Sequence, residues 1–235
     1  RFIAEPVVSS DGTGVLTTII EITEERRRER ALNELLREVS HRSKNLLAII
    51  QSIAAQTARH SETIDEFVSK FRGRLYSLSL SQDLITDSLW RGATFGDLGK
   101  GQISRYLPEI LDQISVESSD IVFPPNAAIH LGLALHELAL NAATHGGGAA
   151  LESTIDVACT TERKGRPVTA TFRWREERRV PVSAGAAEAE APEPHFGRIV
   201  LERVLPASVA GTAHYDVEES GISYTLEFPL EATHE

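Results

Sequence analysis

A single histidine marks a polar, basic segment inside a stretch that otherwise has helical spacing. His41 and Asn45 are four residues apart, so on a helix they share one face, with Arg42 and Lys44 close by. A neutral imidazole can act as a nucleophile, and the two cations could hold an incoming phosphate. The alternative is a surface histidine in a basic helical patch, and this short motif alone does not decide between the two.

A second polar group interrupts a strongly apolar segment, residues 127–145. His136 and Glu137 are adjacent there, and Asn141 follows Glu137 at the i, i+4 spacing of one helix face. An acid and an amide need partners in such a helix, because burying them unpaired is costly. Together they can hold Mg²⁺, directly or through its waters, alongside substrate phosphates. A polar pair satisfied by the backbone is the alternative.

Two further clusters lie closer to the C-terminus. Trp174 and Glu176 stand at the end of an expected strand, and Phe196, Gly197 and Arg198 stand where a loop enters an expected helix. A glycine at a helix N-terminus lets backbone amides approach a phosphate, and the helix dipole favours the anion.

The apolar spacing predicts the elements that must position these residues. An amphipathic pattern without Gly or Pro from residue 24 to 59, followed by a second over 64–85, predicts an antiparallel helical hairpin. The remainder is mixed. We expect a β-hairpin over 1–23, helices over 98–111, 127–145 and 196–205, strands over 114–117, 151–160, 168–175, 212–218 and 222–228, and a loop over 177–194.

Composition excludes several classes of protein. The 235 residues carry 24 basic and 34 acidic side chains, a net charge of −10, which argues against non-specific nucleic-acid binding. One Cys excludes a disulfide framework and fits the reducing cytoplasm. No apolar run approaches the roughly 20 residues of a membrane helix. The chain starts at Arg1 and contains no Met, which predicts a piece of a longer protein but leaves the lack of Met unexplained.

Taken in order, these motifs resemble a known family. His-Arg-x-Lys-Asn from His41, His-Glu-Leu-x-x-Asn from His136 and Trp-x-Glu from Trp174 are similar to the bacterial HWE sensor histidine kinases, which are two-component kinases. The resemblance runs from about residue 36 to 230. Residues 1–23 resemble, more weakly, the last strands of a PAS-type sensor such as a light-sensing LOV domain.

The resemblance implies an α+β protein with three parts. Residues 1–23 would end the sensor, and residues 24–92 would be a linker helix with the dimerisation and phosphotransfer hairpin. Residues 93–235 would be an ATP-binding α/β sandwich of the gyrase type. A homodimer is implied, with a monomer kept open, and a flavin would belong to an upstream sensor domain.

The resemblance also implies a role for each candidate. His41 would receive the γ-phosphoryl group of ATP, with Asn45 beside it, and would pass it to an Asp of a response-regulator receiver domain. Asn141 and Glu137 would organise Mg²⁺, and Glu176 would hydrogen-bond the adenine amino group. The remaining nucleotide-binding candidates are His136, Trp174, Phe196, Gly197 and Arg198, with residues 177–194 as the nucleotide lid.

Some positions depart from the pattern of related kinases. Arg42 follows His41 where common histidine kinases have an acid, so Glu38 or Glu137 would have to act on the proton. Near the phosphates, less usual residues stand at Thr144, Arg178-Arg179 and His195. These departures keep two alternatives open: a degenerate nucleotide-binding scaffold or phosphotransfer module, and a hydrolase that uses Glu137 as base for water.

Overall fold

The computed structural model describes residues 2–9, 12–19, 21–108, 115–117, 121–145, 153–162, 168–178, 196–218 and 221–230. They divide into two compact units, Arg1–Ser52 and Ile53–Glu235. The division falls inside the first helix, whereas the sequence predicts boundaries after residues 23 and 92. Within the described part of the chain, no helix is both long enough and apolar enough to cross a membrane.

The first unit contains a hairpin and most of one long helix. Strands β1 (Phe2–Ser9) and β2 (Gly12–Ile19) pair antiparallel, which confirms the predicted hairpin. Helix α1 (Thr23–Arg59) begins as predicted, with Glu24 and Glu25 in its first turn, where acids favour the helix dipole. Its apolar side chains in this unit are largely exposed: Leu32, Leu35, Leu36, Val39 and Leu47.

Helix α2 (Ile64–Asp87) begins with a capping box. Thr63 Oγ1 accepts a hydrogen bond from the Glu66 amide at 3.2 Å, and the Glu66 carboxylate accepts one from the Glu62 amide at 2.8 Å. The apolar spacing of this helix predicts a stripe that is buried at Leu78 and Ile85, whereas its members Ile64 and Val68 are exposed. The full predicted stripe is Ile64, Phe67, Val68, Phe71, Leu75, Leu78 and Ile85. The buried residues are Arg74, Ser77, Leu78, Ser81 and Ile85.

The second unit contains a five-stranded sheet in the order β4-β6-β7-β9-β8. The strands are β4 (Ser115–Glu117), β6 (Ser153–Glu162), β7 (Val168–Arg178), β8 (Thr212–Glu218) and β9 (Gly221–Leu230). β4 pairs parallel with β6, and the other pairs are antiparallel. Along β7 the side chains alternate, with Phe172, Trp174 and Glu176 buried and Arg173, Arg175 and Glu177 exposed.

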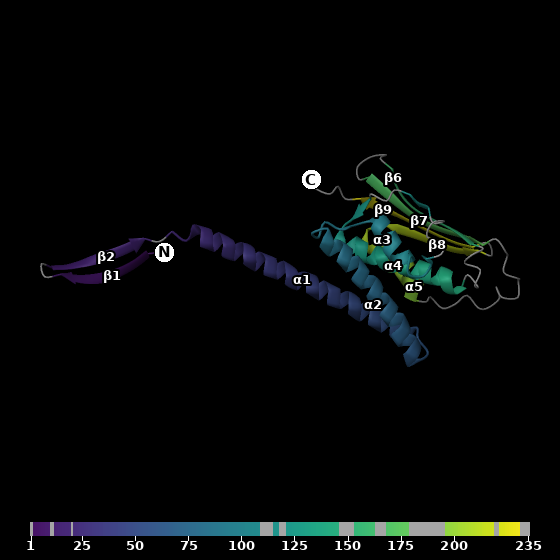
Figure 1. Ribbon diagram of the computed structural model, residues 1–235, viewed down its shortest axis with the longest axis horizontal. Helices are drawn as coiled ribbons and strands as arrows, with labels where there is room; N and C mark the ends of the chain where they lie inside the picture. Colours follow the sequence, from purple (N-terminus) through teal and green to yellow (C-terminus); the bar gives the residue numbers. More distant parts are fainter. Residues whose placement is uncertain are drawn as a thin grey trace. The chain divides into compact units, whose positions relative to one another are not determined.

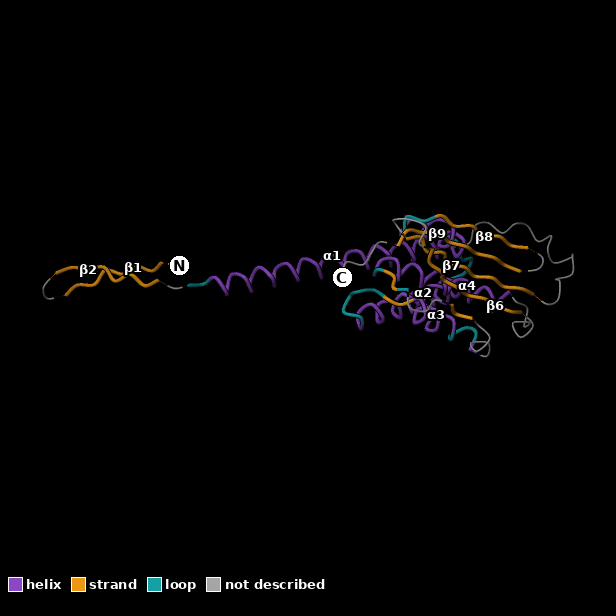
Figure 2. Tube along the Cα trace, turned by 90° about the horizontal axis from the view of Figure 1, so that it is seen from above, coloured by secondary structure: helices purple, strands orange, loops and turns teal. Residues whose placement is uncertain are grey.

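Helices cover the buried face of this sheet (Figures 1 and 2). They are α3 (Phe95–Ile103), α4 (Pro125–His145), α5 (Phe196–Ile199), a π-helical turn η3 (Val200–Val204) and α6 (Leu205–Ser208). Phe95 of α3 joins the helix layer to the sheet, since its ring centroid lies 5.7 Å from that of Phe172 of β7. Tyr224 of β9 lies 5.7 Å from Phe172 within the sheet, and its hydroxyl donates to the Leu201 carbonyl of the helix layer at 2.9 Å. A short pair, β3 (Ala93–Thr94) and β5 (Val122–Phe123), borders the layer. The α+β class is therefore confirmed.

Two predicted helices have different bounds in the structure. The helix expected over 98–111 is α3, which begins earlier because Thr94 caps it: Thr94 Oγ1 accepts from the Asp97 amide at 3.1 Å. It ends at Ile103, and Pro108 disfavours helical backbone in the residue before it. The helix expected over 196–205 continues to Ser208 through the π-helical turn.

Small residues let α2 approach α4 closely. Ser77 Oγ of α2 donates a hydrogen bond to the Gly132 carbonyl of α4 at 3.3 Å, and Gln102 Nε2 of α3 donates to the Ser77 carbonyl at 3.0 Å. A Cβ at position 132 would overlap the hydroxyl of Ser81. Gly132 is therefore required by the spacing of the two helices.

We expect Gly132→Ala to lower the free energy of unfolding by about 1–3 kcal/mol, because the added methyl forces α2 and α4 apart. Gly99→Ala in α3 is the matched control: nothing lies within 4 Å of its added Cβ, and removing a helical glycine stabilises by about 0.5–1 kcal/mol. Urea denaturation of both variants measures the difference. Equal free energies of unfolding for Gly132→Ala and Gly99→Ala would contradict the close approach of α2 to α4 at Gly132.

Candidate functional site

Helix α4 carries three of the predicted site residues. Almost every side chain from Ala127 to Ala139 is buried, so the polar His136 and Glu137 lie inside the protein, only 1% and 3% exposed. Asn141, one turn beyond Glu137 on the same face, is half-buried. The helix therefore holds one buried carboxylate and one accessible amide in line.

The carboxylate of Glu137 is held by an arginine from α2. Arg74 Nε donates to Glu137 Oε1 at 2.8 Å and Arg74 Nη2 donates to Oε2 at 3.3 Å, so both oxygens are engaged. Arg74 Nη1 donates to Thr57 Oγ1 of α1 at 2.9 Å, and that hydroxyl donates to the Ile53 carbonyl at 2.6 Å. All three side chains are buried. Removing one partner of such a buried pair costs about 3–5 kcal/mol.

His136 lies beside this ion pair and stays neutral. Its Nδ1 lies 3.1 Å from the hydroxyl of Tyr106, and its Nε2 lies 4.0 Å from Glu137 Oε1. If Tyr106 donates to Nδ1, the ring proton resides on Nε2 and faces the carboxylate. Burial disfavours the imidazolium and lowers the pKa of His136 to about 4, although the Glu137 carboxylate acts in the opposite direction.

The helical segment after residue 195 also approaches Glu137. A Cβ on Gly197 of α5 would lie 2.9 Å from Glu137 Oε2, so only glycine allows this approach. Arg198, by contrast, is exposed and forms an ion pair with Glu202 at 2.9 Å. The side chain of Phe196 lies outside the described residues. Gly197 therefore joins the Glu137 site, whereas Arg198 points to its own helix.

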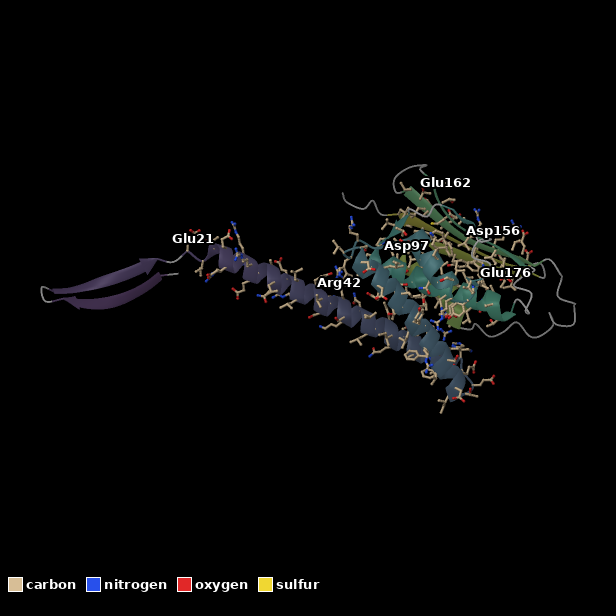
Figure 3. The ribbon with its side chains drawn as sticks, in the orientation of Figure 1. Glu21, Arg42, Asp97, Asp156, Glu162 and Glu176 are labelled. Atoms are coloured by element: carbon tan, nitrogen blue, oxygen red, sulfur yellow. The ribbon has the colours of Figure 1, made fainter. Side chains whose placement is uncertain are left out.

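Strand β7 places two polar groups on the helix-covered face of the sheet. Glu176 is 3% exposed, and its register partners are Ile155 of β6 and Ile222 of β9 (Figure 3). Trp174, fully buried two residues earlier on the same face, has an indole N–H without a hydrogen-bond partner among the described residues. Buried polar groups usually have partners, so this acid and this N–H are candidates for contact with a polar ligand.

The phosphoacceptor candidate lies in the first unit. His41 and Asn45 are both exposed on α1, and Lys44 is exposed beside them. Arg42 (Figure 3) donates to Glu38 Oε1 at 2.7 Å, one turn back on the helix. Glu38, an alternative proton acceptor for His41, is thus already engaged by a cation.

The structure groups some candidates and leaves others apart. His136 and Gly197 both lie close to Glu137. Trp174 and Glu176 share one face of β7. His41 and Asn45 belong to the other compact unit. Arg179 of the predicted lid, and His195 after it, lie outside the described residues. Among the described residues, no group of three or more His, Cys, Asp or Glu side chains could hold a metal ion. A Mg²⁺ role for Glu137 would require its pair with Arg74 to separate.

The sequence analysis missed the residues that surround Glu137. Arg74 is three residues after Phe71 and four before Leu78, so a charge on the apolar side of a predicted helix was the available signal. The helical spacing places Thr57 on the apolar stripe of the first helix but does not indicate its partner, and nothing local marks Tyr106, because each reaches its partner only through tertiary packing.

Residues 38–120 match the HWE histidine kinase family. Over 217 residues, 92% of this chain, the sequence is 26% identical to a blue-light-activated histidine kinase of Brucella ovis. It is 24% identical over 232 residues to blue-light-activated histidine kinase 1 of Erythrobacter litoralis. The chain spans 43% of the length of the first relative and 62% of the second. These relatives support a histidine kinase at the level of the family.

Solved structures show the same fold. The histidine kinase domain of a blue-light activated histidine kinase from Erythrobacter litoralis superposes with a TM-score of 0.52 at 18% identity, covering 87% of this chain and 94% of that one. A longer structure of the Erythrobacter litoralis protein gives 0.55 at 17% identity, covering 98% and 76%. The helices and sheet described above therefore form a histidine kinase domain fold.

The depressed pKa of His136 predicts a pH dependence of stability. The unfolded chain binds a proton near pH 6.5 and the folded chain only near pH 4, so this contribution is complete above pH 6.5 and is lost as the pH falls towards 4. Between pH 7 and 5, wild-type stability should fall by about 2 kcal/mol more than that of His136→Gln. Urea denaturation at both pH values measures this difference.

Tyr106→Phe serves as the control for that experiment. It removes the hydrogen bond to Nδ1 and keeps the buried imidazole, so it should retain the wild-type pH dependence. A His136→Gln variant with the wild-type pH dependence would show that His136 is not the group responsible.

Proposed function

We propose that this chain is a protein-histidine kinase that transfers the γ-phosphoryl group of ATP to His41. The observation that carries the proposal is the combination of a family match that encloses His41 with a histidine kinase fold in which α4 presents Asn141 and β7 buries Glu176. The degenerate scaffold and the hydrolase are the alternatives, and they differ from the kinase in whether His41 becomes phosphorylated.

In this proposal the second unit binds the nucleotide. Glu176 accepts a hydrogen bond from the adenine amino group, and the Trp174 face of β7 packs against the base. Asn141 is the accessible ligand on α4, and Mg²⁺ bound there would neutralise charge on the phosphates. Gly197 lets the backbone after residue 195 come close to α4. These residues position the γ-phosphoryl group rather than react with it.

The reaction then takes place at the first unit's histidine. A ring nitrogen of His41 attacks the γ-phosphorus in line, the new P–N bond forms as the bond to the β-phosphate oxygen breaks, and ADP leaves. The exposed Lys44 beside His41 supplies a cation for the incoming phosphoryl group, and Asn45 supplies an amide on the same face. The proton of the ring is released to a base, for which Glu137 is our proposed group.

The wider function is proposed on the same basis. A phosphohistidine is a phosphoryl donor, so we infer transfer to an Asp of a receiver domain. The exposed apolar face of α1 supports the homodimer predicted from the sequence. Cytoplasmic location and light regulation through a flavin-binding sensor also stay proposals. Activation by blue light is named for the relatives, of which this chain spans 43% and 62%.

Incubation with γ-labelled ATP and Mg²⁺ should give a label that is stable to base and labile to acid. His41→Gln should abolish it, because no other group can form the same P–N bond at this site. His60→Gln, one residue beyond the C-terminal end of the same helix, should label at the wild-type rate. No label in the wild-type protein would favour the scaffold, and phosphate release that survives His41→Gln would favour the hydrolase.

Glu176→Ala should weaken ATP binding at least tenfold, because the buried carboxylate that receives the adenine amino group is lost. The matched control is Glu177→Ala, one residue on and exposed on the opposite face of β7. Titration calorimetry with ATP and with ITP, which lacks the amino group, measures both affinities. An equal loss for ATP and ITP would show that Glu176 does not read the base.

A further inference from the structure

The ion pair between Arg74 and Glu137 uses every oxygen that Glu137 could offer to a reaction. Arg74 Nε and Nη2 donate to Oε1 and Oε2 at 2.8 and 3.3 Å, and Gly197 closes against Oε2. The Glu137 and Arg74 side chains are only 4% and 5% exposed. A carboxylate in this state is poorly placed to accept a proton or to join a metal's ligand shell.

We propose that Arg74 controls the reaction through Glu137: the ion pair withholds Glu137, and its separation precedes phosphoryl transfer. This inference rests on the proposed kinase function and adds to it a regulatory positioning residue on α2. In the closed arrangement the guanidinium stabilises a buried charge. Once α2 has shifted, water solvates Glu137, and its carboxylate can accept a proton or join a metal's ligand shell.

The arrangement is suited to two discrete states. A guanidinium fork gains most of its energy only when both hydrogen bonds form, so a small displacement of α2 loses much of the interaction. The Arg74 guanidinium is enclosed on all sides. Thr57 of α1 accepts a hydrogen bond from its Nη1 at 2.9 Å, and α4 covers its other side. A shift of helices is therefore needed to separate the pair.

Thr57 offers a route by which α1 acts on the pair. It is the residue of α1 that orients Arg74, and its own hydroxyl is fixed by the Ile53 carbonyl. A rotation of α1 at this point would remove the acceptor of Nη1 and loosen the guanidinium from Glu137. The helix that carries His41 thus also carries the contact that steadies the closed pair.

The test compares initial rates of His41 phosphorylation in the full chain. Arg74→Met keeps the apolar length of the side chain and removes the guanidinium. The closed state is therefore destabilised by the loss of its ion pair, whereas the stability of the open state changes little. We expect at least a threefold rise in rate, and a smaller rise for Thr57→Val. Arg72→Met, an exposed arginine on the same helix, is the matched control and should label at the wild-type rate.

A double-substitution cycle shows whether Arg74 acts through Glu137. In a Glu137→Gln background, which itself should be slow, Arg74→Met should give no further rise. A merely structural role would lower the rate in both backgrounds. If Arg74→Met does not fold, as its thermal melt would show, Arg74→Lys and Thr57→Val decide: a rise in either supports the proposal, and no rise overturns it.

The outcomes separate this inference from the kinase proposal. If the wild-type protein labels His41 and folded Arg74→Met labels at an equal or lower rate, the control by Arg74 is wrong and the kinase stands. If no protein in the series labels His41, the kinase proposal fails and this inference fails with it.

Discussion

One buried ion pair governs how the second unit is organised. Burying the Glu137 carboxylate inside an apolar helix layer is costly without a cation, and Arg74 of α2 supplies one while Thr57 of α1 accepts a further hydrogen bond from the guanidinium. Because these contacts come from three helices, α2 and α4 are joined within one compact unit, Ile53–Glu235. The close approach at Gly132 and the hydrogen bond from Ser77 also hold α2 against α4.

The nucleotide-binding candidates depend on the opposite layer. The sheet fixes Trp174 and Glu176 by strand register, and the contact of Phe95 with Phe172 and the hydrogen bond from Tyr224 to the Leu201 carbonyl hold helices against the same face. In the proposed kinase the two layers would have separate roles. The sheet would hold the base through Glu176, whereas α4 would carry the groups near the phosphates, and α2 would control the availability of Glu137.

Local patterns in the sequence predicted much of this and failed where contacts are distant. α1, α4 and both C-terminal strands were predicted because each carries its own periodicity. The bounds of α3 were wrong because the Thr94 cap was not recognised. The buried face of α2 was predicted only in part, at Leu78 and Ile85. Arg74 belongs to it, and its partner lies 63 residues away, beyond any pattern within one element.

The most direct test of this account locks α2 to α4. A Cβ at position 132 would lie 3.4 Å from the Cβ of Ser81, near disulfide spacing, and Ser81→Cys removes the hydroxyl that this Cβ would overlap. Ser81→Cys with Gly132→Cys should therefore form a bond that holds the Arg74–Glu137 pair closed. We predict that the oxidised protein binds ATP but phosphorylates His41 at least tenfold more slowly, and that reduction restores the rate. Ser81→Cys alone should not respond to oxidation. Equal rates before and after reduction of the double variant would contradict the claim that Glu137 must be released.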